Sequence, residues 1–150
     1  MAQTLTKILM HVVFSTKDRR NLIATAIEPD LHAYLGGICR NHESPALAIG
    51  GTENHVHLLI SLSKNIALSQ LMMALKKDSS KWIKTKGDAM RQFHWQDGYG
   101  AFSIGESQAD AVTEYIRGQK ERHRSISFED ELMALAKRYG VAFDTRYLWS

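Results

Sequence analysis

Cysteine, proline and long apolar runs are all scarce in this chain of 150 residues. The single cysteine, Cys39, excludes a disulfide-stabilised scaffold, and ten glycines with two prolines exclude a collagen-like chain. No stretch approaches the roughly 20 apolar residues that a membrane-spanning helix needs. The first residues also lack the pattern of a secretory signal. One unpaired cysteine without an export signal predicts a cytoplasmic protein that does not contact a membrane.

The overall composition is that of a folded globular protein. Hydrophobic residues make up 44% of the chain and charged residues 23%, which excludes a disordered chain. A chain of this length can bury a substantial core. We therefore predict one domain that spans residues 1–150.

Positive charge is modest in total but concentrated in two segments. The formal net charge is +3, yet segment 64–91 has seven Lys and Arg against two acidic residues, and segment 7–20 has four against one. Together these segments carry +8, so the rest of the chain carries −5. Such clusters suit a polyanion partner, because Lys and Arg neutralise phosphates. On charge alone, a solvated helix face and a basic turn are the more common explanation.

The hydrophobic pattern predicts strands that alternate with helices. Strands are predicted at four short apolar runs: 8–14, 45–49, 55–61 and 101–104. Helices are predicted where apolar residues recur at helical spacing: 29–41 and 68–86. Gly87 is expected directly after the second of these helices, and Gly50 and Gly51 are expected to begin a hairpin turn. Capping-box patterns at Ser107 and Ser127 predict two more helices, and Gly140 is expected to end the last one.

The order of the first six elements is β-α-β-β-α-β, which matches the ferredoxin-like arrangement. We therefore predict an α+β fold with an antiparallel sheet and both long helices on one face. The two further helices follow at the C-terminal end, and the first of them carries Tyr115. The opposite face of the sheet must then be covered by other elements or be used for function.

Two histidines share one face of the predicted strand 55–61. His55 and His57 are two residues apart, so both side chains project from the same side, opposite the apolar Val56 and Leu58. Two imidazoles side by side make half of a metal site. Alone, a His-x-His pair is more often two surface histidines.

A tyrosine and a glutamine share one face of the helix predicted from Ser107. Tyr115 and Gln119 are four residues apart, so their side chains stack beside the apolar stripe of that helix. Taken singly, Tyr115 is explained as a half-buried aromatic residue and Gln119 as an exposed helix residue.

In combination these segments resemble a known family. Residues 53–60 resemble the His-hydrophobic-His motif of the HUH superfamily of single-strand DNA nucleases. Residues 112–123 resemble the catalytic-tyrosine helix of its single-tyrosine transposases, the family of the IS200-like insertion sequences and their repeat-associated relatives. The similarity extends over nearly the whole chain, through four further segments: 11–17, 75–82, 95–103 and 146–149.

The resemblance implies a single-strand DNA transposase that cleaves and rejoins DNA ends through a 5′-phosphotyrosine intermediate. It makes Tyr115 the nucleophile. It makes His55, His57 and Gln119 the ligands of a divalent metal, Mg²⁺ or Mn²⁺. Two imidazoles and an amide oxygen leave positions open for phosphate oxygens and water. A phenol, with a pKa of about 10, also leaves more readily than an alkyl alcohol when a 3′-hydroxyl attacks to rejoin the strands.

The resemblance further implies partners: single-stranded DNA with hairpin ends, and a second copy of the chain. In such a homodimer the tyrosine helix of one subunit completes the metal site of the other. Gly118 would suit a mobile arm, although a neutral surface position explains it better. Contacts with DNA phosphates are expected at the basic residues of the two segments: Lys17, Arg19, Arg20, Lys76, Lys77, Lys81 and Lys84. Four aromatic side chains are candidates for base stacking, although core packing is the commoner explanation: Trp82, Trp95, Tyr99 and Phe102.

Three further residues are expected near the site. Asn54 stands where the family usually has Asp, so it would orient His55 without a charge. His11 on the first strand and His123 after Gln119 are candidate neighbours, and Cys39 is expected to pack in the core. Two other function classes stay open: a non-catalytic protein that binds single strands or hairpins on the same fold, and a metal enzyme unrelated to DNA.

Overall fold

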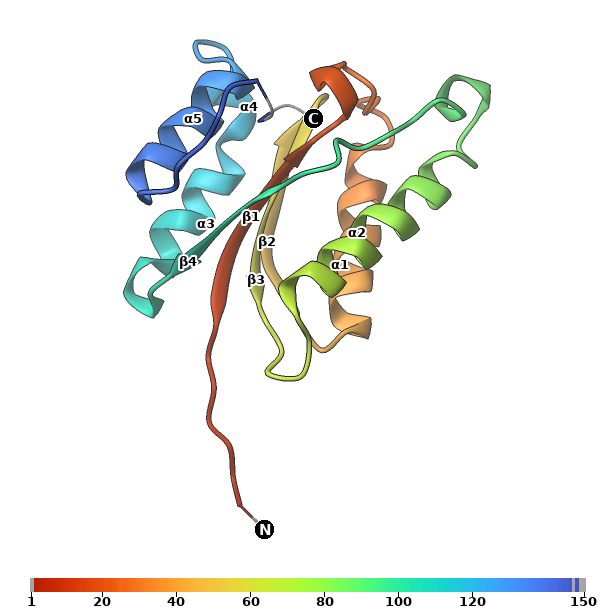
Figure 1. Ribbon diagram of the computed structural model, residues 1–150. Helices are drawn as coiled ribbons and strands as arrows, with labels where there is room; N and C mark the ends of the chain where they lie inside the picture. The colour runs from red at the N-terminus through yellow and green to blue at the C-terminus, as the bar shows by residue number, and fades with distance from the viewer. Residues whose placement is uncertain (1, 147, 149–150) are drawn as a thin grey trace.

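The computed structural model describes residues 2–146 and 148, and it is built on an antiparallel sheet (Figure 1). The four strands of this sheet are β1 (Leu9–Ser15), β2 (Ala46–Thr52), β3 (His55–Ser61) and β4 (Gly100–Ile104). They lie in the order β2-β3-β1-β4, and every neighbouring pair is antiparallel. The α+β, ferredoxin-like prediction is therefore confirmed. Positions 147 and 149 of the C-terminal similarity lie outside the described residues.

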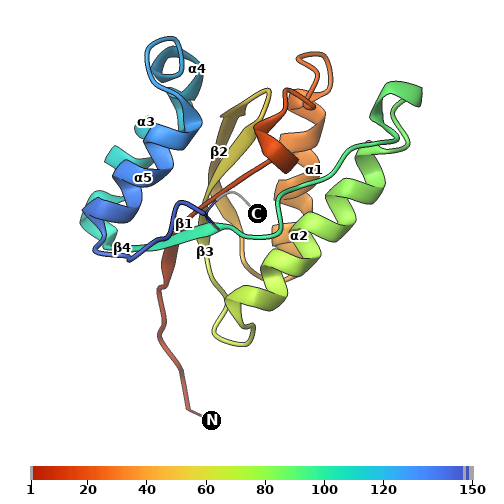
Figure 2. The ribbon, with the colours of Figure 1, turned by 45° about the horizontal axis from the view of Figure 1, so that its top comes forward.

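Helices cover both faces of the sheet (Figures 1 and 2). The two long helices, α1 (Glu28–Asn41) and α2 (Leu68–Ile83), lie together on one face, as predicted. The other face is covered by three shorter helices: α3 (Ala109–Arg117), α4 (Gln119–Arg122) and α5 (Phe128–Arg138). The histidine-bearing face of β3 is therefore enclosed by the C-terminal helices.

Strand alternation divides the core into two layers. Val56, Leu58 and Ile60 belong to the large cluster beneath α1 and α2, and Cys39 packs there at 0% exposure, as predicted. On the opposite face, Leu59 packs with residues of α3, and a separate cluster lies beneath α5. His55 and His57 project from that face as well. Both histidines therefore lie on the face of the sheet that α3 and α5 cover, beside the two smaller apolar clusters.

Some predicted boundaries are wrong. Ser107 does not cap a helix but lies in a 3₁₀ turn, Glu106–Gln108. Gly105 takes the capping position instead, because its N–H donates a hydrogen bond to the Gln108 side chain at 3.4 Å. Helix α2 ends at Ile83, so Gly87 lies in the following loop, with a φ of 125°. The cap of α5 is as predicted, since Ser127 accepts a hydrogen bond from the Asp130 N–H at 3.1 Å.

The helix predicted to run from Ser107 past Gln119 is interrupted at Gly118. Helix α3 ends at Arg117, and α4 begins again at Gln119. The Gln119 side chain nevertheless donates a hydrogen bond to the Tyr115 carbonyl oxygen at 3.3 Å. The two residues therefore remain neighbours across the break.

Gly50 lies inside β2 rather than at a turn, and the hairpin turns at residues 53–54 instead. A Cβ at Gly50 would lie 2.2 Å from the backbone oxygen of Ile116, so the glycine lets α3 approach the sheet. We expect Gly50→Ala to displace α3 and to lower the free energy of unfolding by about 1–3 kcal/mol, measured by urea denaturation.

The matched control is Gly36→Ala in α1, where the new Cβ would meet no atom closer than 3.6 Å. Alanine favours helix more than glycine does, so this variant should be as stable as the parent or slightly more stable. A parent-like stability of Gly50→Ala would contradict the close approach of α3.

No helix within residues 2–146 and 148 is long and apolar enough to cross a membrane. The cytoplasmic location stays a prediction.

Candidate active site

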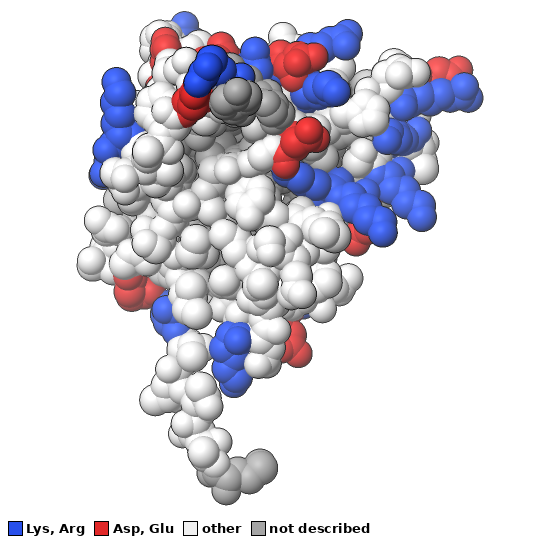
Figure 3. All heavy atoms as spheres, viewed as in Figure 1, with Lys and Arg blue, Asp and Glu red and all other residues white. Residues whose placement is uncertain are grey.

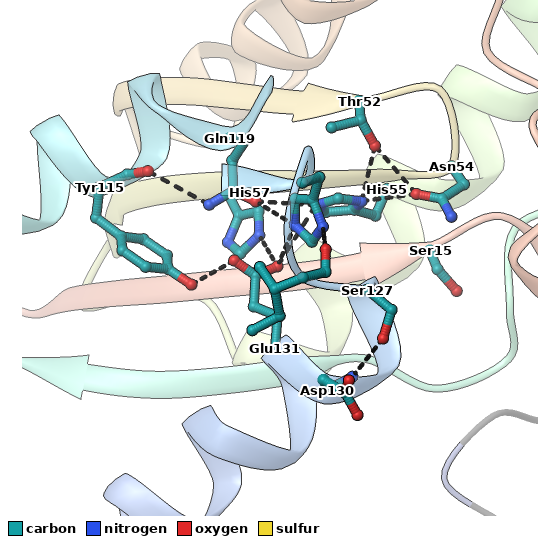
Figure 4. A network of polar contacts seen from close by, with 12 residues as sticks. Ser15, Thr52, Asn54, His55, His57, Tyr115, Gln119, Ser127, Asp130 and Glu131 are labelled. Carbon is teal, nitrogen blue, oxygen red and sulfur yellow. Dashed lines mark hydrogen bonds and ion pairs between the residues drawn. The ribbon is translucent and has the colours of Figure 1, made fainter. Parts of the chain in front are cut away.

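The two histidines of β3 lie at the centre of a buried polar cluster (Figure 4). Both side chains are 0% exposed. His55 Nε2 lies 3.0 Å from Gln119 Oε1. The structure therefore brings together His55, His57 and Gln119, the three residues that the family resemblance assigns to the metal.

A carboxylate that the sequence analysis did not identify lies in the same cluster. Glu131 of α5 is 2% exposed, and its Oε1 lies 3.1 Å from His57 Nε2 and 3.5 Å from His55 Nε2. One ligand atom from each of these three residues lies within 4.8 Å of the others, a spacing that could hold a metal ion. A signal was present in the sequence: Glu131 falls in the apolar stripe of α5 between Phe128 and Leu135, where an unpaired charge would be costly.

The partners of His55 fix its proton on the side away from the cluster. Its Nδ1 lies 2.8 Å from Asn54 Oδ1 and 3.0 Å from Thr52 Oγ1. The amide oxygen of Asn54 only accepts hydrogen bonds, so Nδ1 is the protonated nitrogen and Nε2 offers its lone pair. Asn54 is thus a direct hydrogen-bond partner of His55, and it also donates a hydrogen bond from Nδ2 to the Arg19 carbonyl oxygen at 3.2 Å.

Two hydrogen-bond acceptors therefore face each other at the centre. The Gln119 amide nitrogen donates to the Tyr115 carbonyl, which turns Gln119 Oε1 toward the unprotonated His55 Nε2. Burial, followed by the charge of His57, lowers the pKa of His55 to about 3, so this nitrogen is not protonated at neutral pH. A cation between a nitrogen lone pair and an amide oxygen would relieve their repulsion. The residues therefore fit a divalent metal.

His123 carries the positive charge that balances Glu131. Its Nδ1 donates to the Ile126 carbonyl oxygen at 2.7 Å, and its Nε2 lies 3.0 Å from both Gln119 Oε1 and Glu131 Oε1. All three partners are acceptors, so both ring nitrogens are protonated. Burial alone would lower the pKa of His123, but the hydrogen bond and the charge of Glu131 raise it. Burial would likewise raise the pKa of Glu131, but hydrogen bonds from His123 and His57 lower it.

Tyr115 of α3 reaches the cluster from the same chain. Its hydroxyl donates a hydrogen bond to Glu131 Oε2, and its ring centroid lies 5.8 Å from that of His57. Burial, followed by the hydrogen bond and the charge of Glu131, raises the pKa of Tyr115. The phenol is therefore protonated at neutral pH. The Arg122 guanidinium lies over the ring face, 4.2 Å from its centroid.

His11 of β1 extends the cluster on the side of Tyr115. Its Nε2 lies 2.8 Å from His57 Nδ1, so it is a direct neighbour of the pair, as expected. Its side chain is 2% exposed. Burial, followed by the charge of His57, lowers the pKa of His11 to about 3, so the ring is neutral at neutral pH.

Acid is expected to destabilise this cluster. The histidines of an unfolded chain titrate near pH 6.5, whereas His11 and His55 are protonated in the folded state only near pH 3. Between these values the unfolded chain binds more protons, so the free energy of unfolding falls as the pH drops below about 6.5. Each histidine contributes a slope of up to about 1.4 kcal/mol per pH unit. His123, with its raised pKa, is protonated in both states below pH 6 and adds no slope there.

Urea denaturation between pH 6.5 and pH 5 measures this slope. In His11→Asn the slope of unfolding free energy against pH should be shallower than in the parent, by the contribution of one proton. A parent-like slope in His11→Asn would contradict the assignment.

The predicted DNA-contacting lysines and arginines differ in their surroundings. Figure 3 shows Lys and Arg side chains gathered on the side of the molecule where α2 lies in Figure 1. Among the predicted residues, four are exposed and Lys84 is half-buried; the exposed ones are Lys17, Arg20, Lys77 and Lys81. Arg19 Nε lies 3.2 Å from Glu129 Oε1. The Lys76 ammonium donates to the carbonyl oxygens of residues 96–98, so it holds that loop against α2.

The aromatic candidates also differ. Trp95 and Phe102 are buried, which confirms core packing for both. Trp82 is half-buried and stacks on Tyr34, with ring centroids 5.0 Å apart. Tyr99 is 39% exposed. Of these four side chains, Trp82 and Tyr99 are therefore the ones with accessible surface.

The fold and the site together define a class of protein: a ferredoxin-like sheet whose face carries a histidine pair, a carboxylate and a tyrosine hydroxyl at one centre. A family model described as "Transposase IS200 like" matches residues 4–119. The chain therefore belongs to the IS200-like transposase family. The match ends at Gln119, so Glu131 lies in the part of the chain beyond it.

Two solved structures that are similar to this chain in fold are described as transposases. One is a crystal structure described as a candidate transposase from Deinococcus radiodurans R1, with a TM-score of 0.65 and 19% identity over 77% of this chain and 93% of that chain. Another is a REP-associated tyrosine transposase bound to a REP hairpin, with a TM-score of 0.59 and 14% identity over 84% of this chain and 74% of that chain. A comparison with curated proteins found no match.

Proposed function

We propose that this chain is a metal-dependent, single-strand DNA transposase that uses Tyr115 as its nucleophile. Membership of the family establishes a transposase, and DNA cleavage and transfer in general. The observation that carries the finer proposal is the meeting of the Tyr115 hydroxyl with Glu131, which also contacts His55 and His57.

We assign four ligands to the metal: His55, His57, Gln119 and Glu131. The facing acceptors on His55 and Gln119 support this assignment, and the carboxylate supplies negative charge. Imidazole and oxygen donors together suit Mn²⁺ and are compatible with Mg²⁺. When bound, the metal would act as a Lewis acid on the scissile phosphate and stabilise the leaving 3′ oxygen.

Two residues of the chain have roles in strand cleavage: Glu131 accepts the proton of the Tyr115 hydroxyl, and Tyr115 holds the 5′ end of the cleaved DNA. The Tyr115 hydroxyl already donates to Glu131 Oε2, so this carboxylate accepts the proton as the phenolic oxygen attacks phosphorus. The bond from phosphorus to the 3′ oxygen breaks, and the departing 3′ oxygen takes a proton from solvent water and leaves as a 3′-hydroxyl. The 5′ phosphate stays on Tyr115 as a phosphodiester. Attack by a 3′-hydroxyl reverses the sequence and rejoins the DNA.

A hairpin-ended single strand is the proposed substrate. The relative described as bound to a REP hairpin supports this class of DNA. We propose that the basic residues Lys17, Arg20, Lys77, Lys81 and Lys84 contact its phosphates, since their side chains are exposed or half-buried.

A synthetic single-stranded hairpin with Mn²⁺ tests the function. We expect a covalent protein–DNA adduct that survives denaturing electrophoresis, and we expect a chelator to prevent it. Hairpin binding without an adduct, in both Mn²⁺ and Mg²⁺, would instead favour the non-catalytic binding protein. Weak, salt-independent binding of single strands would favour a metal enzyme unrelated to DNA.

The family resemblance implies a homodimer whose sites are shared between subunits, and a mixing experiment distinguishes shared sites from sites that one chain completes by itself. One chain alone brings Tyr115, Gln119 and the histidine pair together, so we expect no adduct from an equal mixture of Tyr115→Phe and His57→Ala. Each variant keeps the part that the other lacks. Adduct formation by the mixture, with none from either variant alone, would establish that sites are shared between subunits.

A further inference from the structure

Two cavities lie on different sides of the buried centre. One, of about 410 Å³, is lined by residues that include His123 and Asn54. The other, of about 290 Å³, lies between α3 and α5, and its lining includes Tyr115 and His11. Figure 2 shows α3 and α5 running along the same face of the sheet. A strand bound at Tyr115 therefore has the second cavity beside it, whereas the first cavity lies on the side of His123 and Asn54.

The charges that line the two cavities are opposite in sign. Among the described residues, the carboxylates of Asp18, Glu53 and Glu129 line the first cavity. Its cations are Arg19, which pairs with Glu129, and the His123 imidazolium, which pairs with the buried Glu131, so negative charge is in excess. Among the described residues that line the second cavity there is no carboxylate, and Arg138 carries the charge. A phosphate is therefore repelled by the first cavity and attracted by the second.

Arg138 is available for a ligand. It is exposed at the last turn of α5, and within the described part of the chain its side chain forms no hydrogen bond or ion pair. Gln108 also lines this cavity; its amide oxygen accepts the Gly105 N–H, and its amide nitrogen offers two donors. A guanidinium is well suited to a phosphate, because its planar N–H groups contact two phosphate oxygens at once.

We propose that the cavity between α3 and α5 binds one nucleotide next to the scissile phosphate, and that Arg138 contacts the phosphate of that nucleotide. The proposal rests on the proposed function of Tyr115. The cavity volume lies at the lower end of the roughly 300–1,000 Å³ typical of small-ligand sites, which suits one nucleotide and excludes a duplex stem. Arg138 also lies beyond residue 119, where the family match ends, so this subsite belongs to the C-terminal helix of this chain.

The place of Arg138 in the last turn of α5 offers a second explanation for an arginine there, because positive charges stabilise the C-terminal ends of helices. Lys137 shares that position but does not line the cavity. Lys137→Ala is therefore the matched control for Arg138→Ala.

Fluorescence anisotropy with a single-stranded hairpin measures the contact. Arg138→Ala should bind about tenfold more weakly than the parent, and the slope of log affinity against log salt should fall by about 0.7. Arg138→Lys should recover most of the affinity, and Lys137→Ala should match the parent. Unchanged affinity and slope in Arg138→Ala would overturn the proposal.

Neutral methylphosphonates, placed one at a time along the strand, locate the phosphate. At one position, the methylphosphonate should weaken binding by the parent protein but should not weaken binding by Arg138→Ala any further. If at every position the loss from the methylphosphonate adds to the loss from Arg138→Ala, the proposed contact is wrong.

The adduct assay separates the two proposals. If the adduct forms but Arg138→Ala binds normally, the subsite alone is wrong. If no adduct forms but one methylphosphonate position has no further effect in Arg138→Ala, the subsite is supported and the assignment of Tyr115 as the nucleophile is wrong.

Discussion

Tyr115→Phe is expected to form no covalent adduct with a single-stranded hairpin while binding it with parent-like affinity. The substitution removes only the hydroxyl, which donates to Glu131, and leaves the ring in contact with His57 and His11. Without the phenolic oxygen no phosphodiester to the protein can form. Denaturing electrophoresis measures the adduct, and anisotropy measures binding on the same sample.

Tyr34→Phe is the control for loss of a tyrosine hydroxyl, because Tyr34 lies in α1 on the opposite face of the sheet and its ring stacks on Trp82. It should retain the adduct. An adduct that persists in Tyr115→Phe would show that another residue is the nucleophile.

The second large effect is expected at the carboxylate of α5. Glu131→Gln should weaken Mn²⁺ binding by about 100-fold or more, since even the loss of an outer partner of a ligand costs about 10–100-fold. The amide keeps the shape of the side chain but removes its negative charge. It also leaves the His123 imidazolium without its counter-charge and removes the proton acceptor of Tyr115. Calorimetric titration with MnCl₂ measures the affinity, and adduct yield should fall with it.

Glu129→Gln controls for loss of an acidic side chain from the same helix turn. Glu129 pairs with Arg19 and does not contact the histidine pair, so its Mn²⁺ affinity should match the parent. A folded Glu131→Gln protein, judged by circular dichroism, with parent-like Mn²⁺ affinity would remove Glu131 from the ligand set.

Strand periodicity predicted the fold well where one physical cause dominates. The two-residue alternation of β3 placed the strand at 55–61 and set both histidines on one face, as observed. Sequence patterns gave wrong boundaries where the same residue type is compatible with more than one local structure. Gly50 favours a turn in sequence terms, but here it provides space for α3, so β2 continues to Thr52. The Ser107 capping pattern was likewise displaced by the overlapping Gly105–Gln108 pattern.

The residues of the candidate site were predicted from the resemblance as far as His123. Glu131 could not be predicted in the same way, because its role depends on how α5 packs across the sheet, 74 residues along the chain from His57. A carboxylate in an apolar helical stripe was the one local indication. The engagement of Lys76 by three loop carbonyls also depends on tertiary packing that charge patterning does not reveal.

The most direct test of the central claim is to identify the residue that becomes attached to DNA. Parent protein incubated with the hairpin and Mn²⁺ is digested and sequenced by tandem mass spectrometry. A protease that cleaves after glutamate should be used, since trypsin leaves Tyr99 and Tyr115 on one peptide between Arg91 and Arg117. We predict one 5′-phosphonucleotide, attached to Tyr115 in the peptide 115–121. Attachment at any other residue, or cleaved DNA that carries no protein, would contradict it.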